Sequence, residues 1–186
     1  MLQKSFSLIA LALVLAGPLK AQDKFFTKSG RIEFYSKAPL EDIEARNKSA
    51  AAVLDARSGA LQFSVLMKGF EFENALMQEH FNENYIESDK FPKADFKGSV
   101  VNNGEVQYTK PGTYPVRVKG KLTIHGVTRD VETAGTIKVE GSDLKATTSF
   151  NILLSDYNIK IPSLVKDKVS NNVKIVVDCK LEPFKG

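Results

Sequence analysis

The sequence predicts an all-β protein built as an antiparallel meander of about eight strands. Three observations lead to this prediction. Apolar and polar residues alternate with a period of two along most of the chain, tight-turn sequences separate the alternating segments, and only two short segments have helical spacing. One apolar and one charged face on each strand is typical of a closed barrel with an apolar interior. A two-sheet sandwich would show much the same alternation, so periodicity alone leaves both architectures open.

The expected strands follow one another along the chain. Five strands are clear from the alternation. We expect three further strands of similar length at 50–57, 94–101 and 130–140. In those five, the apolar residues share one face: Ile32 and Phe34 in 31–36; Leu61, Phe63, Val65 and Met67 in 61–67; Val116, Val118, Leu122 and Ile124 in 116–126; Leu144, Ala146, Phe150, Ile152 and Leu154 in 144–154; Val173, Ile175, Val177, Cys179 and Leu181 in 173–182. Turn sequences such as Ser58-Gly59 and Pro111-Gly112 lie between them.

Two segments interrupt the alternation. Asn74–Phe81 places Leu76, Met77, His80 and Phe81 on one helical face, which Tyr85 continues. Residues 163–170 predict a short second helix, with Leu164 and Val165 as its only apolar contacts. Pro92 cannot donate a ladder hydrogen bond, so we expect it just before the strand at 94–101.

The N-terminus has the features of a secretory signal. Lys4 precedes an unbroken apolar run at Phe6–Ala16, Gly17-Pro18 breaks the helix, and Ala21 supplies the small residue before a cleavage site. The apolar run is too short to span a bilayer. We therefore expect residues 1–21 to be a cleaved signal peptide, residues 22–186 to form a single domain, and the protein to be periplasmic or secreted.

Charge and cysteine content exclude several classes of protein. Loss of Lys4 and Lys20 lowers the formal net charge from +4 to about +2, and the remaining basic residues are scattered, so no nucleic-acid surface is predicted. Cys179 is the only cysteine, which rules out an intramolecular disulfide. We expect Cys179 to be a buried small hydrophobe.

Catalytic and metal-binding patterns are missing from the sequence. His80 and His125 are the only histidines, and no G-x-S-x-G stretch accompanies them. His125 precedes Gly126 in an expected hairpin turn, where its ring should face solvent. Glu79, Glu83 and Cys179 are the other candidate ligands, but no pair among them and the two histidines has the spacing of metal ligands on a shared element. The sequence thus predicts no catalytic residues, no metal and no cofactor, and a protein that is not an enzyme.

Two stretches resemble a known family. The sequence MQEHFNENYIESDKFPKADFKG (77–98), followed by VRVKGKLTIHGVTRDV (116–131), is similar to the YceI-like family of bacterial periplasmic proteins. The resemblance extends over nearly the whole mature chain. It implies an eight-stranded antiparallel lipocalin-like barrel with short helices near the mouth. It also implies that the interior binds an amphiphilic lipid, typically a polyisoprenoid such as a quinone or a prenyl chain.

A barrel of eight strands is just wide enough either to be filled by side chains or to hold one small ligand. The sequence leaves these two outcomes open. If a ligand enters, residues 77–92 should cover the mouth as a helix and loop, with His80 a hydrogen-bonded helix residue. The expected contacts with an apolar ligand are Phe34, Phe63, Val65, Met67, Met77, Phe81, Tyr85, Phe91, Phe96, Ile124, Phe150 and Ile152.

The function predicted from these features is binding, transport or storage of an amphiphilic lipid with a polyisoprenoid, quinone-like or fatty-acyl chain, with transient membrane contact. One alternative is a filled barrel that serves as a structural or stress-related interaction module. A further alternative is an enzyme that acts on a lipid head group. Patterning of this kind does not determine the oligomeric state.

Overall fold

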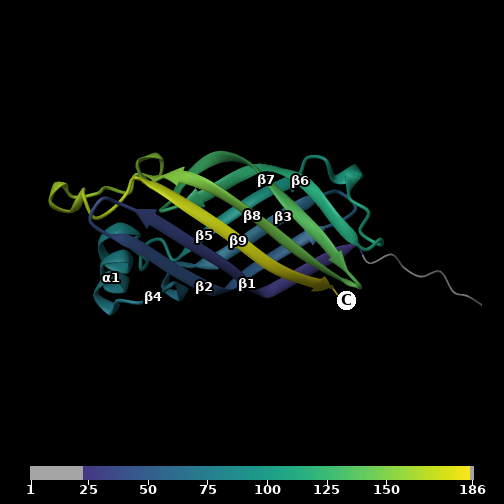
Figure 1. Ribbon diagram of the computed structural model, residues 1–186, viewed down its shortest axis with the longest axis horizontal. Coiled ribbons are helices and arrows are strands. Elements are labelled where there is room, and N and C mark those ends of the chain that lie inside the picture. Colours follow the sequence, from purple (N-terminus) through teal and green to yellow (C-terminus); the bar gives the residue numbers. More distant parts are fainter. Residues whose placement is uncertain (1–22, 185–186) are drawn as a thin grey trace, which may run out of the picture.

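The protein is a closed antiparallel β-barrel with its α-helix at one end (Figure 1). The computed structural model describes residues 23–184. The strands are β1 (Lys24–Lys37), β2 (Asp42–Asp55), β3 (Ala60–Leu66), β4 (Glu71–Phe72), β5 (Lys93–Val100), β6 (Gly112–Ile124), β7 (Val127–Glu140), β8 (Asp143–Leu153) and β9 (Asn172–Pro183). Within residues 23–184 there is one α-helix, α1 (Ala75–His80), which continues into a π-helical turn at Phe81–Tyr85. The expected signal peptide, residues 1–21, lies outside the described residues.

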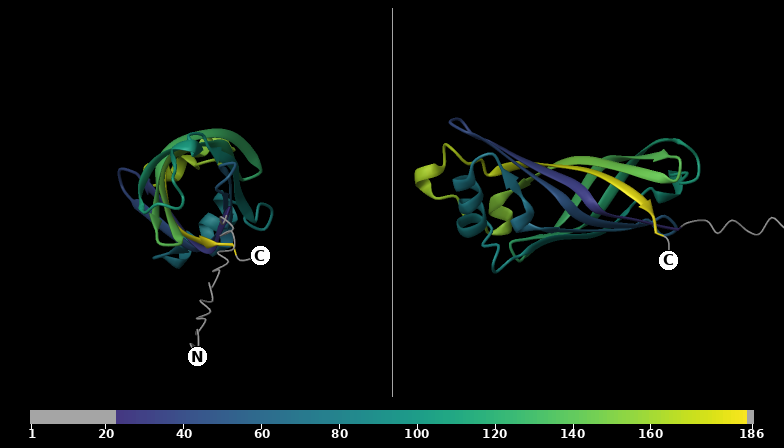
Figure 2. Two further views of the ribbon diagram at one scale, coloured as in Figure 1. Left: turned by 90° about the vertical axis from the view of Figure 1, so that its right-hand side faces the viewer. Right: turned by 90° about the horizontal axis from the view of Figure 1, so that it is seen from below.

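Closure of the sheet decides between barrel and sandwich. The strand order is β1-β9-β8-β7-β6-β5-β3-β2, and β1 also pairs with β2, so the first and last strands of the sheet meet. All of these pairings are antiparallel. The view along the barrel shows the resulting ring (Figure 2). The predicted eight-stranded antiparallel barrel is therefore confirmed, with β4 as an extra strand that pairs only with β2.

The first two strands are longer than the alternation predicted. The register between β1 and β2 shifts on both sides of Gly30, which marks a bulge. Gly30 is required there because a Cβ atom would lie 2.6 Å from Sγ of Cys179. This bulge interrupts the period-two pattern, and that is why only 31–36 could be recognised as a strand.

Two apolar clusters occupy the two ends of the barrel. At the end away from α1, Phe25 stacks on Tyr108 with ring centroids 6.1 Å apart, above buried Leu54, Leu144 and Leu181. At the α1 end, Val65, Met67 and Ile152 belong to a second cluster, which includes residues of the helical segments. The barrel is thus closed by packed side chains at one end, and its other end, the mouth, is surrounded by helices and loops.

The expected helix at 163–170 does not form. Only a single 3-10 turn is present at Ser163–Val165, followed by further turns. Leu164 makes no core contact, since 95% of its surface is exposed. Of the three apolar residues in the segment, Leu164 is in solvent, and Val165 and Val169 alone are too few to hold a longer helix against the barrel.

The paired glycines Gly98 and Gly120 provide a test of how tightly the wall is packed. They face each other across β5 and β6, and the Phe96 ring lies over both. A Cβ atom on Gly98 would overlap the Lys119 carbonyl oxygen and lie 2.6 Å from Cζ of Phe96. Gly98→Ala should therefore lower the free energy of unfolding by about 1–3 kcal/mol, as overpacked sites do.

Gly104→Ala is the matched control, because a Cβ atom there meets nothing within 4 Å. Removal of a glycine at such a site leaves stability unchanged or raises it by about 0.4–1 kcal/mol. Chemical denaturation of both variants measures the difference. Equal stability of the two would contradict the close packing between β5 and β6.

Candidate functional site

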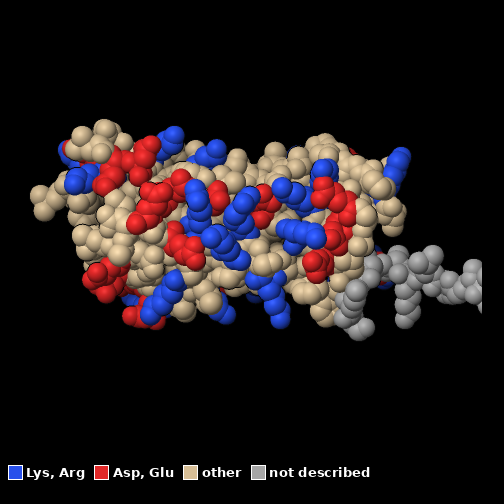
Figure 3. Space-filling model, turned by 60° about the horizontal axis from the view of Figure 1, so that its bottom comes forward, with Lys and Arg blue, Asp and Glu red and all other residues tan. Residues whose placement is uncertain are grey.

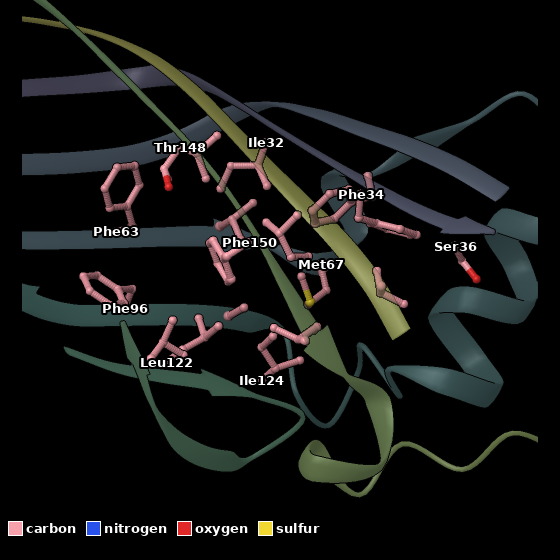
Figure 4. Close-up of a pocket in the computed structure, with 18 of the residues that line it drawn as sticks. Ile32, Phe34, Ser36, Phe63, Met67, Phe96, Leu122, Ile124, Thr148 and Phe150 are labelled. Atoms are coloured by element: carbon pink, nitrogen blue, oxygen red, sulfur yellow. The ribbon is translucent and has the colours of Figure 1, made fainter. Parts of the chain in front are cut away.

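The barrel encloses an apolar cavity of about 480 Å³. This volume lies within the range of about 300–1,000 Å³ that is typical of small-molecule sites. The residues that line it come from every long strand and from α1. Figure 4 shows lining side chains of β1, β3, β5, β6 and β8, among them Phe34, Phe63 and Phe150. The barrel is therefore hollow, which decides the question that the alternation left open.

Most residues named from the sequence line this cavity. The lining contains Phe34, Phe63, Val65, Met67, Met77, Phe81, Tyr85, Phe96, Ile124, Phe150 and Ile152. Further lining residues were not among the expected ligand contacts, although the alternation had already placed Ile32, Leu122, Val173 and Ile175 on the apolar faces of their strands. Val131 and Ile137, in the expected strand at 130–140, also line the cavity.

Phe91 is the exception among the expected contacts, because it does not line the cavity. Its ring packs edge-on against His125 at a centroid distance of 4.5 Å, and Nζ of Lys90 lies 4.9 Å from the Phe91 centroid. Phe91 thus supports the turn at His125-Gly126.

The segment that follows β4 forms one side of the mouth. Asn74 caps α1, since its Oδ1 accepts hydrogen bonds from the backbone N–H groups of Leu76 and Met77. Phe81 anchors the helix to the barrel through ring contacts with Phe34 at 5.5 Å and Phe72 at 5.1 Å. The expected helical face, Leu76, Met77, His80 and Phe81, lines the cavity.

The prediction that His125 faces solvent is wrong. Only 11% of its side chain is exposed, and the ring lies between two acceptors. Nε2 is 2.8 Å from Oε2 of Glu87, and Nδ1 is 3.1 Å from the Tyr157 carbonyl oxygen. The hydrogen bond to His125, with Lys90 nearby, holds the pKa of Glu87 below its ordinary value. Because His125 and Gly126 both have positive φ, the turn directs the ring inward between two loops.

His80 is placed at the opening of the cavity. Glu41, Asn74 and Lys168 line the mouth together with it. Its side chain is exposed. Contrary to expectation, its side chain makes no hydrogen bond within the described part of the chain. Residues 23–184 contain no group of three or more His, Cys, Asp or Glu side chains that could hold a metal ion. The polar side chains at the mouth can contact a head group.

The polar groups within the wall are already paired. Four threonines line the cavity where the β7–β8 ladder ends at Gly135 and Thr148. Thr133 and Thr148 are linked through their hydroxyls at 3.1 Å, and Thr136 and Thr147 at 2.7 Å. Between residues 23 and 184, no buried side-chain nitrogen or oxygen lacks a hydrogen-bond partner. Such an interior favours a hydrocarbon, because a polar ligand would lose its hydration without gaining partners.

A closed barrel with a dry cavity and a mouth rimmed by polar groups defines a class of small-molecule-binding β-barrels. Within that class, the chain belongs to the YceI-like domain family, which matches residues 19–181. A comparison with curated protein sequences gave no match.

Solved structures with this fold are distant in sequence. A polyisoprenoid-binding domain from Saccharophagus degradans is 13% identical, with a TM-score of 0.76 over 87% of this chain and 99% of that domain. BcnA from Burkholderia cenocepacia is 18% identical, with a TM-score of 0.68 over 82% and 95% of the two chains. A YceI protein from Campylobacter jejuni is 16% identical, with a TM-score of 0.59 over 76% and 85%. At these identities, the likeness establishes the shared fold.

The fold makes the thiol of Cys179 unreactive by burying it. It is fully buried, as predicted, and burial raises the pKa of its thiol to about 12. Because the thiolate is the nucleophile, iodoacetamide at pH 8 should leave Cys179 unmodified in the folded protein and alkylate it after denaturation. Mass spectrometry measures the adduct. Rapid modification of the folded protein would contradict this placement.

His125→Gln should destabilise the protein. The amide can replace one hydrogen bond of the ring but cannot reach both Glu87 and the Tyr157 carbonyl, and Phe91 loses its ring contact. The expected loss in free energy of unfolding is about 1–3 kcal/mol. Chemical denaturation measures it, and His80→Gln, at the exposed mouth, serves as the control. A His125 variant as stable as the control would show that the ring does not hold these loops together.

Proposed function

We propose that this protein binds one amphiphilic lipid, with the apolar tail inside the barrel and the head group at the mouth, and carries or stores it outside the cytoplasm. The single observation that supports this most directly is the apolar cavity of about 480 Å³ with no unpaired polar side chain in its buried wall. The Saccharophagus degradans neighbour is a polyisoprenoid-binding domain, which makes a polyisoprenoid the first ligand to test.

Export is part of the proposal. It rests on the signal-like sequence at Met1–Ala21, with its apolar run and small residue before the cut. None of the helices between residues 23 and 184 has the length and hydropathy needed to cross a bilayer.

Binding without catalysis is also proposed. A filled barrel acting as an interaction module is disfavoured by the cavity itself. An enzyme that acts on a head group would need a nucleophile beside a general base at the mouth. One serine, Ser36, lines the cavity at this end, and its Oγ accepts a hydrogen bond from the Ser170 N–H at 2.9 Å. Within the described residues, Ser36 makes no hydrogen bond with His80, Glu41 or Lys168, so no base activates it.

Ile152→Phe tests the binding site. Ile152 is buried on the inward face of β8 and lines the cavity, so a larger ring there should obstruct a bound tail. Lipid per chain should fall several-fold in protein purified from an envelope fraction, measured by organic extraction and mass spectrometry.

Leu153→Phe is the matched control, because Leu153 is the next residue of β8 and is 43% exposed on the outer face. It should retain the wild-type lipid content. Chemical denaturation accompanies both measurements, since overpacking a filled core would instead cost about 1–3 kcal/mol. A wild-type protein that never carries lipid, together with a strongly destabilised Ile152 variant, would overturn the proposal.

A further inference from the structure

The most exposed large apolar side chains lie around the mouth. Among residues 23–184, Leu164 is 95% exposed, Leu40 71% and Leu76 56%, and every other large hydrophobic residue is less exposed. Leu40 is in the β1–β2 hairpin, Leu76 is in α1, and Leu164 is in the segment between Tyr157 and β9. These are the elements that surround the mouth. Val101, which is 49% exposed, lies at the opposite end of the barrel.

Leu40 and Leu164 belong to one connected structure. The backbone N–H of Leu40 donates to the Asp167 carbonyl at 2.9 Å, and the N–H of Ser170 donates to Oγ of Ser36 at 2.9 Å. Hydrogen bonds therefore join the hairpin to residues 163–170, which project past the strand ends (Figures 1 and 2). Val165 lines the cavity while the neighbouring Leu164 is in solvent. An exposed leucine thus sits immediately beside the opening.

The charge around these leucines differs from that of the barrel wall. On the wall, lysines pair with acids, as in Lys119–Glu132 at 3.7 Å and Lys121–Asp130 at 3.1 Å, and the two signs are interspersed (Figure 3). Lys160, Lys166 and Lys168 are all exposed, and within the described residues none of the three makes an ion pair. Asp167 lies between them, and Glu41 and Asp42 follow Leu40 in the adjoining hairpin, where Lys37 is also exposed. Residues 37–42 and 160–168 together therefore hold four lysines against three acids, a small positive excess.

The other side of the mouth has the opposite charge. Glu73, Glu79 and Glu83 lie on or next to α1 and its π-helical turn, and all three are exposed. An anionic surface would therefore attract the lysine side of the mouth and repel the α1 side. This asymmetry fixes the orientation of any such contact.

We propose that Leu40, Leu164, Lys160, Lys166 and Lys168 form a docking edge that binds bilayers containing anionic phospholipids; this inference rests on the proposed lipid-binding function. The leucines enter the boundary between head groups and acyl chains, and the lysines contact the phosphates. The opening of the cavity then lies beside the bilayer surface. A lipid tail can pass between the two with little exposure to water.

Vesicle flotation tests the docking edge. The mature chain should float with vesicles of phosphatidylethanolamine and phosphatidylglycerol, and more weakly with vesicles of phosphatidylcholine alone. Leu164→Ser should weaken binding about tenfold, which corresponds to about 1.4 kcal/mol. Lys160→Gln with Lys166→Gln should reduce binding to the anionic vesicles and lower its salt sensitivity. Val101→Ser is the control and should bind as the wild type does.

A second measurement separates docking from lipid binding. Wild type and Leu164→Ser are loaded with a polyprenol from detergent micelles, and native mass spectrometry gives the lipid per chain. Equal loading with weaker flotation of the variant supports the docking edge. Equal loading with equal flotation overturns the docking edge and leaves the proposed function intact. No loading of either protein refutes the proposed function, while flotation still decides the docking edge.

A second copy of this chain is the alternative partner for these leucines. If Leu164→Ser converts a wild-type oligomer to a monomer in sedimentation velocity without a change in flotation, the edge is a contact between copies of this chain. That result would also overturn the proposal.

Discussion

Closure of the sheet is the constraint on which the rest of the structure depends. Because β1 pairs with both β2 and β9, each strand has one face inside the barrel and one face outside. A register slip of one residue would turn the apolar face of a strand outward. The alternation of the sequence and the closed ring therefore require each other, and together they give a dry interior.

Dryness alone would be satisfied by a filled barrel, so the cavity needs a separate cause. Small residues lie beside large ones on the inner wall: the Phe96 ring lies over Gly98 and Gly120, and Ala146 and Thr148 share β8 with Phe150. The short side chains at these positions leave part of the interior unfilled. The end away from α1 is nevertheless packed closed, by Phe25 against Tyr108. The space that remains extends to the α1 end, where His80 and Lys168 line it.

The sequence predicts the features that depend on residues close together in the chain. The inward faces of the strands and the face of α1 follow from period-two and helical spacing, so Phe34, Phe150 and Phe81 lie where they were expected. The contacts of His125 could not be predicted, because its partners Glu87 and Tyr157 are 38 and 32 residues away in the chain. Phe91 was misplaced for the same reason. Whether the barrel is hollow depends on how side chains from different strands meet, and alternation carries no information about that.

The division of polar groups between wall and mouth has a thermodynamic consequence. Each methylene that enters the cavity from water gains about 0.8 kcal/mol, but a tail that comes from a membrane leaves an equally dry place. The tail then contributes little to the net free energy of exchange between membrane and protein. Side chains such as His80 and Lys168 at the mouth are free of ion pairs and side-chain hydrogen bonds within the described chain, whereas the polar groups of the buried wall are paired. In the proposed function, selectivity among lipids that share a tail would therefore arise at the mouth, beside the proposed docking edge.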